Sequence, residues 1–102
     1  MYDLRISVSA HRDLDEIFSY ITHKLHNPSA AKSLADAISE KYALLVQHPK
    51  MFELSQNEQL SQKGYRRCII ENYLLFYRVD ETKKEVFIAR VFYGRQNYAK
   101  YL

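Results

Sequence analysis

Three apolar runs separated by very short polar breaks constrain this chain more than any other feature. The runs cover residues 65–70, 73–79 and 86–93, and they are rich in Tyr, Phe, Ile, Val and Leu. Side chains of these types favour a pleated strand. Because breaks this short can join only antiparallel neighbours, the sequence predicts a three-stranded antiparallel meander.

The first half of the chain predicts one strand and two helices. Residues 2–8 alternate between apolar and polar side chains, as in a half-buried strand. Residues 10–25 repeat apolar side chains at spacings of three and four, and Ser9 stands where an N-cap is expected. Pro28 excludes helical geometry at Asn27, and the same pair then starts a second helix that runs to about residue 47. The short connection predicts an antiparallel helical hairpin.

This order of elements predicts an α+β fold in a single domain, residues 1–102. An N-terminal strand, a helical hairpin and a meander place the helices on one face of a twisted sheet. The other face must then be covered by a loop, by the C-terminal tail or by a partner. Residues 49–64 are expected to form a polar, irregular surface loop, in which four apolar residues are the candidate anchors: Met51, Phe52, Leu54 and Leu60.

Composition narrows the class of protein without deciding its activity. No run approaches the roughly 20 apolar residues of a membrane span, and no signal-peptide pattern opens the chain, so a cytoplasmic protein is expected. The formal net charge is +3, and its excess falls in the second half, together with most of the tyrosines. Arginine beside tyrosine suits phosphate contact and base stacking, and it equally suits a protein interface. Both interpretations stay open.

No metal or cofactor site is expected. All four histidines lie in the helical half, and no Asp, Glu or Cys joins them at a familiar ligand spacing. The chain has only two glycines, Gly64 and Gly94, so it has no glycine-rich phosphate loop. Cys68 lies in an alternating strand and is expected to be a small core residue.

Two arginines inside the apolar runs are candidates for structure or for function. Strict alternation places each among apolar side chains of its own strand: Arg78 with Leu74 and Phe76, and Arg90 with Val86, Ile88 and Phe92. A charge there is costly unless it is paired or faces a groove. An internal ion pair with Glu71 or Asp36 is one interpretation, and a cationic groove on the open sheet face is the other. Arg66 and Arg67 point to opposite faces, so at most one joins that groove.

Three segments carry a family resemblance. They are Asn27-Pro28 with Ala30-Ala31, NYLLFYRV at 72–79 and RVFYGRQNY at 90–98. Together they resemble the RelE/ParE superfamily of toxins over nearly the whole chain. The resemblance implies the toxin of a type II toxin–antitoxin pair, and a small acidic antitoxin that folds on binding. A homodimer and a toxin–antitoxin hetero-oligomer both stay open.

The superfamily contains two activities, and the sequence resembles one more than the other. RelE-like members are ribosome-dependent endoribonucleases that cut messenger RNA, whereas ParE-like members inhibit DNA gyrase. RelE-like chains carry basic residues at alternate positions on the strand matching 65–70, and an arginine after the tyrosine that opens the next strand. Arg66 fits the first position, but Cys68 and Leu74 stand at the others. The resemblance therefore implies gyrase inhibition, with the mRNA interferase as the alternative.

The candidate site residues differ between these activities. For a ribonuclease, Arg66, Arg90 and Arg95 would supply positive charge, and Tyr93 or Tyr98 would supply the acid. A general base is missing from that set, because no histidine lies in the sheet half. For a gyrase inhibitor, the expected target-binding residues are Tyr93, Arg95 and Tyr98, at and beyond the end of the last strand.

Overall fold

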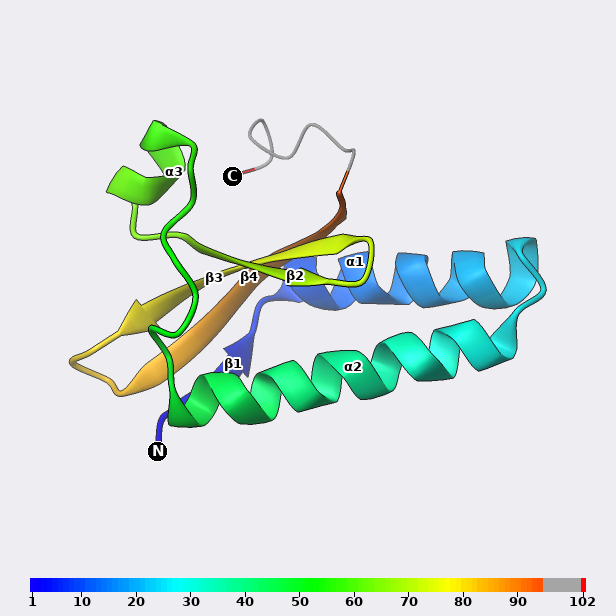
Figure 1. Cartoon of the computed structure of the whole chain (residues 1–102), viewed down its shortest axis with the longest axis horizontal. Coiled ribbons are helices and arrows are strands. Elements are labelled where there is room, and N and C mark those ends of the chain that lie inside the picture. Colours follow the sequence, from blue (N-terminus) through cyan, green and yellow to red (C-terminus); the bar gives the residue numbers. More distant parts are fainter. Residues whose placement is uncertain (95–101) are drawn as a thin grey trace.

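A four-stranded mixed sheet packed against a helical hairpin makes up the fold (Figure 1). The computed structural model describes residues 1–94 and Leu102. The strands, in chain order, are β1 (Asp3–Ile6), β2 (Arg66–Ile70), β3 (Tyr73–Asp80) and β4 (Glu85–Tyr93). Their order in the sheet is β1-β4-β3-β2, and β1 pairs with β4 in parallel. The predicted α+β fold is confirmed, and β2, β3 and β4 form the antiparallel meander.

The helical hairpin matches the prediction at its turn and differs at its start. The helices, in chain order, are α1 (Val8–Ser19), the π-helical turn η1 (Tyr20–Lys24), α2 (Pro28–Gln47) and α3 (Glu58–Gln62). Asn27 caps α2 as expected, because its side chain accepts the Ala30 N–H. Ser7, and not Ser9, caps α1, since its Oγ accepts the Ala10 N–H at 2.9 Å. The strand prediction therefore ran too long: Val8 is helical and exposed.

The segment expected to be irregular contains the short helix α3, which covers the second face of the sheet. The Asn57 side chain caps this helix by accepting the Leu60 N–H. Leu60 is buried and packs on a second, smaller core cluster with Leu74, Phe76 and Phe92. In Figure 1, α3 lies across the sheet from the two long helices. Of the four expected anchors, two are wrong because nearly half of each residue is exposed: Met51 and Leu54.

The main core lies between the sheet and the hairpin. Buried side chains of α2 meet buried side chains of the strands there: Leu34, Ile38 and Leu45 against Cys68, Leu75, Tyr77, Val86, Ile88 and Val91. Cys68 is fully buried, as predicted, and burial raises the pKa of its thiol. The sheet thus has one face toward the hairpin and one toward α3, which we call the inner and the outer face.

A β-bulge in β4 decides which residues reach each face. Phe76 lies opposite Arg90, but the next residue of β3, Tyr77, lies opposite Ile88, so Ala89 is an extra residue. The alternation of β4 reverses at this point, and Arg90 turns to the outer face with Phe92. The prediction that Arg90 shares a face with Val86 and Ile88 was therefore wrong.

Two tyrosines with buried hydroxyls differ in whether the hydroxyl has a hydrogen-bond partner. The Tyr77 hydroxyl donates to the Pro49 carbonyl at 2.8 Å, whereas the buried Tyr42 hydroxyl has no hydrogen-bond partner among the described residues. Tyr77→Phe should lower the free energy of unfolding by about 0.5–1.5 kcal/mol, and Tyr42→Phe should leave it unchanged or raise it. Urea denaturation at neutral pH would measure both. An equal loss in the two variants would contradict the assignment.

The same two phenols predict a loss of stability at high pH. Burial raises the pKa of each from 10.0 to about 12. Because the folded pKa exceeds the unfolded one, the stabilisation is complete below about pH 10 and is lost as pH rises through about 12. We expect the free energy of unfolding to fall less steeply between these values in the double Tyr42→Phe, Tyr77→Phe variant. Parallel slopes for parent and variant would refute this linkage.

Candidate functional site

A groove of about 940 Å³ opens between the first helix and the end of the sheet. The helical side, with the residue after η1, contributes one half of its lining: Asp13, Glu16, Ile17, Tyr20 and Leu25. The sheet contributes the other half, from β3, β4 and the turn before β3: Asn72, Tyr73, Arg90, Val91 and Tyr93. Because three tyrosines line it, we call it the tyrosine groove.

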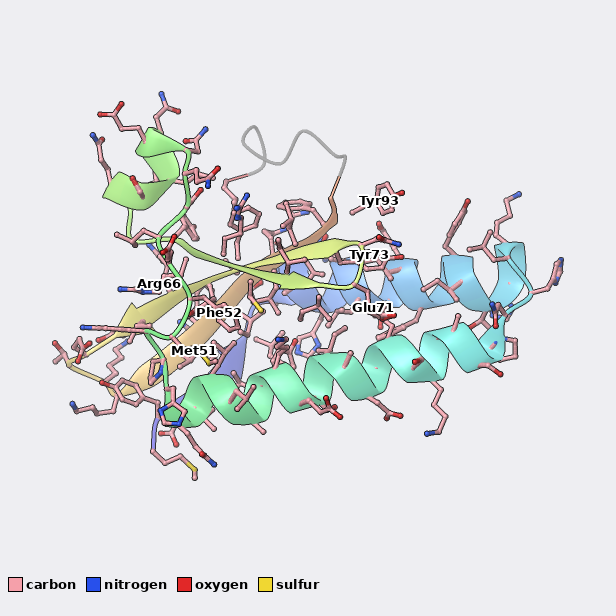
Figure 2. The ribbon with its side chains drawn as sticks, in the orientation of Figure 1. Met51, Phe52, Arg66, Glu71, Tyr73 and Tyr93 are labelled. Carbon is pink, nitrogen blue, oxygen red and sulfur yellow. The ribbon has the colours of Figure 1, made fainter. Side chains whose placement is uncertain are left out.

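The tyrosines supply neutral aromatic rings to this groove. Tyr73 and Tyr93 are cross-strand neighbours, and their rings meet edge to face with centroids 5.8 Å apart (Figure 2). Tyr93 is 46% exposed and Tyr20 is 55% exposed. Burial raises the pKa of the Tyr73 hydroxyl, and the neighbouring Tyr93, Glu71 and Tyr20 raise it further. Tyr73 therefore stays protonated at neutral pH and acts there as a hydroxyl donor rather than a phenolate.

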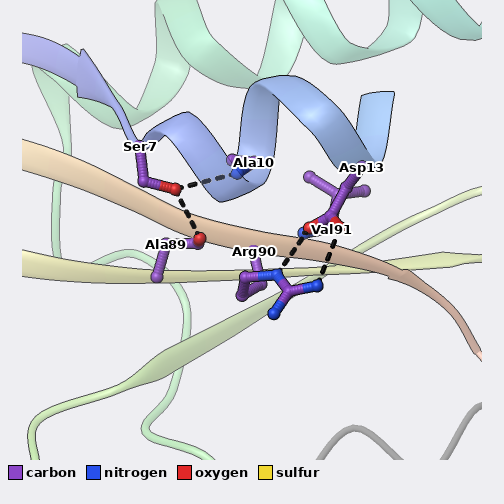
Figure 3. Close-up of polar contacts among 6 residues, drawn as sticks. All are labelled: Ser7, Ala10, Asp13, Ala89, Arg90 and Val91. Atoms are coloured by element: carbon purple, nitrogen blue, oxygen red, sulfur yellow. Dashed lines mark hydrogen bonds and ion pairs between the residues drawn. The ribbon is translucent and has the colours of Figure 1, made fainter. Parts of the chain in front are cut away.

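One carboxylate fixes the floor of the groove. The Asp13 carboxylate accepts hydrogen bonds from Nε and Nη2 of Arg90 at 2.8 and 2.9 Å (Figure 3). It also accepts a hydrogen bond from the Val91 N–H at 2.9 Å. Both side chains are largely buried, and the guanidinium lies 4.6 Å from the centre of the Phe92 ring. The expected ion-pair partners, Glu71 and Asp36, were wrong: the chain brings α1 against β4, and this places Asp13 there.

The edge of β4 explains why this contact forms. β1 ends at Ile6, and the Ser7 N–H makes the last backbone bond to β4, at Ile88. Beyond that point, backbone groups of β4 lie next to α1 instead of a strand. The Ser7 hydroxyl donates to the Ala89 carbonyl at 2.7 Å, and Asp13 accepts the Val91 N–H (Figure 3). Two side chains of the first helical turns thus satisfy groups that would otherwise be buried without partners.

The structure does not bring Arg66 to the groove. Its Nη1 donates to the Phe52 carbonyl at 2.7 Å. It lies opposite Tyr77, which is four residues along β3 from Tyr73, or about 13 Å at the usual strand rise. Figure 2 shows Arg66 beside Phe52, away from Tyr73 and Tyr93. Arg66 therefore holds the segment after α2 against the sheet.

The side chains of Arg67 and Arg78 lie on the outer face of the sheet. Arg67 and Arg90 lie on either side of Phe76 in the strand register, so Arg67 is the member of the Arg66-Arg67 pair on this face. The two-residue turn before Tyr73 fixes that register, so the outward position of Arg67 could have been predicted from the sequence. Arg78 is exposed, and its guanidinium lies 5.0 Å from the Tyr65 ring centre. An internal ion pair at Arg78 was therefore a wrong expectation.

The end of β4 sits close to the turn between β2 and β3. The Gly94 N–H donates to the Asn72 carbonyl at 2.8 Å, and a Cβ at Gly94 would lie 3.1 Å from that same oxygen. A side chain here would require the Asn72 carbonyl to shift by a few tenths of an ångström, so the close approach favours glycine. Arg95 and Tyr98, two of the expected target-binding residues, lie outside the described residues.

The part of the chain that the structure describes offers neither a metal site nor a membrane span. No three of its His, Cys, Asp and Glu side chains are grouped so that they could hold a metal ion. None of its helices is both long enough and apolar enough to cross a bilayer. The chemistry of the groove is therefore that of its carboxylates, its paired arginine and its phenols.

The Asp13–Arg90 pair predicts a large and specific effect on stability. Arg90→Met should lower the free energy of unfolding by about 3–5 kcal/mol, because it leaves a largely buried carboxylate with only the Val91 N–H. Arg78→Met is the matched control; its guanidinium is exposed over Tyr65, so a change below about 1 kcal/mol is expected. Thermal and urea denaturation would measure both. A smaller loss in Arg90→Met than in the control would contradict the pairing.

Comparison with known proteins identifies the family. Residues 4–98 match the family model of the ParE toxin of type II toxin–antitoxin systems, parDE. Toxin ParE1 of Caulobacter vibrioides is 32% identical over 79 residues, which are 78% of each chain. The chromosomal ParDE system from P. aeruginosa has a TM-score of 0.70 at 25% identity, covering 91% of this chain and 96% of the other. The RelBE2 complex of Mycobacterium tuberculosis, with a TM-score of 0.64 at 22% identity over 90% and 96%, shares the fold. The resemblance noted in the sequence is confirmed, and this chain belongs to the ParE toxin family of type II toxin–antitoxin systems.

Proposed function

We propose that this toxin acts in the cytoplasm by binding and inhibiting DNA gyrase, and that a cognate antitoxin neutralises it. Membership of the ParE family supports the proposal. The observation that carries it further is the separation of Arg66 from the tyrosines that a ribonuclease would need beside it. Arg66 lies opposite Tyr77, four residues along β3 from Tyr73, which pairs with Tyr93. Its guanidinium donates to a backbone carbonyl.

RNA cleavage needs an acid, a base and cations within hydrogen-bond reach of one phosphate. Arg90 is near Tyr93 in the groove, but Asp13 already takes two of its donors and neutralises its charge. The sheet half contains no histidine to act as a base. These features favour a toxin that acts by contact, in which aromatic and arginine side chains bind a protein surface.

A protein partner is also supported by the outer edge of β2 beyond Arg67. The start of that edge is already paired, since the Arg67 N–H donates to the Glu53 carbonyl. This strand is at the edge of the sheet, and Ile69 on it is 59% exposed. Met51 and Leu54 are exposed in the neighbouring segment, and Leu54 forms a bridge with Arg66. Beyond this bridge the edge of β2 is exposed, and an exposed strand edge with apolar side chains is a surface that proteins normally cover. A small acidic antitoxin, ordered on binding, suits both this surface and the formal net charge of +3.

Two assays on one toxin preparation would test the target. The first follows the supercoiling of relaxed plasmid by purified gyrase, and the second follows messenger RNA in a reconstituted translation reaction. We expect supercoiling to be blocked, messages to remain intact, and the antitoxin to reverse the block. Ribosome-dependent cleavage with normal supercoiling would instead establish the mRNA interferase.

Arg95→Lys should retain antitoxin binding and lose most of the gyrase inhibition. Arg95 directly follows Gly94, whose N–H is bonded at the turn that precedes Tyr73. Arginine offers a planar fork of donors that lysine does not reproduce. Arg78→Lys is the control, since Arg78 is exposed over Tyr65. Inhibition by Arg95→Lys at the parental level would move the search for the contact to Arg67 and the 49–64 segment.

A further inference from the structure

The tyrosine groove has a local charge opposite to that of the whole protein. Asp13 and Arg90 cancel each other in their ion pair. Glu16, which lines the groove one turn further along α1, is exposed and has no ion-pair partner among the described residues. A net negative groove thus lies on a chain of formal net charge +3.

The rings of this groove are suited to a cation. Tyr20 follows Glu16 by four residues, so both side chains lie on one side of the helix. Tyr73 and Tyr93 stand opposite them, with Tyr93 and Tyr20 about half exposed. The faces of aromatic rings attract a guanidinium or ammonium within about 6 Å. One unpaired carboxylate among three phenol rings is therefore a receptor for a positively charged side chain.

We propose that the tyrosine groove binds an arginine side chain of the toxin's protein target, with Glu16 as its ion-pair partner and the tyrosine rings as its stacking surface. The assignment of that target as gyrase rests on the proposed function. Arginine fits better than lysine, because its planar fork matches a carboxylate while its face stacks on a ring. The groove volume of about 940 Å³ leaves room for the residues that flank the arginine.

A small probe tests the receptor without any knowledge of the partner. The purified toxin is titrated with N-acetyl-arginine amide and, separately, with the uncharged N-acetyl-citrulline amide. The NMR signals of its tyrosine ring protons are followed during each titration. The ring signals of Tyr20, Tyr73 and Tyr93 should shift and saturate with the arginine probe alone. Equal shifts with both probes, or none with either, would overturn the proposal.

Three variants assign the binding to individual side chains. Glu16→Gln should weaken binding of the arginine probe by about two- to fivefold, whereas Asp15→Asn, which removes the neighbouring exposed charge outside the groove, should not. Tyr20→Phe should retain binding because it keeps the ring face, and Tyr20→Ala should lose it. Unchanged probe binding in Glu16→Gln would overturn the ion pair.

Measuring gyrase inhibition by the same variants then tests whether the arginine belongs to gyrase or to another protein. Glu16→Gln should weaken inhibition by a similar factor while antitoxin binding stays at the parental level. If antitoxin binding weakens and inhibition does not, the arginine belongs to the antitoxin and the assignment to the target is wrong. A parent toxin that selects the arginine probe but does not inhibit gyrase would refute the proposed function and confirm the receptor.

Discussion

The Asp13 carboxylate is the contact on which the rest of this structure depends. It joins the first helix to the longest strand through the Arg90 guanidinium and the Val91 N–H. β4 needs such a contact, because its parallel partner β1 stops at Ile6 while β4 continues to Tyr93. A helix cannot continue a strand ladder, so side-chain oxygens must satisfy the backbone instead. This contact holds α1 against β4 at the floor of the groove.

The same pair also decides the electrostatics of the groove. A largely buried ion pair contributes little net stability compared with apolar residues, because both charges lose their hydration. Its effect here is to fix geometry and to neutralise Arg90. The arginine that sequence patterns offer as a catalytic cation therefore carries no free charge into the groove, and Glu16 sets the sign that an incoming group meets.

Local signals predicted the elements of this fold well, and long-range contacts explain what they missed. Asn27-Pro28 and the two-residue turn before Tyr73 encode their own geometry, so the hairpin and the meander could be predicted. The bulge at Ala89 has no glycine or proline to mark it, and strict alternation therefore put Arg90 on the wrong face. Asp13 lies 77 residues before Arg90, and no local pattern connects them. The helix α3 has a single buried apolar residue, Leu60, which is too little to produce a period.

The sheet arginines show why composition left two functions open. Nucleic-acid-binding and protein-binding surfaces both use cationic and aromatic side chains that are free to contact a partner. A sequence does not show which of its cationic side chains already have a contact within the fold. In the structure three of the sheet arginines have an internal contact: Arg66 with the Phe52 carbonyl, Arg78 with the Tyr65 and Phe87 rings, and Arg90 with Asp13 and the Phe92 ring. Cations that are stacked or paired within the fold contribute less to a phosphate-binding surface than their number suggests. These three cations are thus engaged within the fold, and the groove beside the sheet presents phenols and an unpaired carboxylate, which suit a cationic group better than a phosphate.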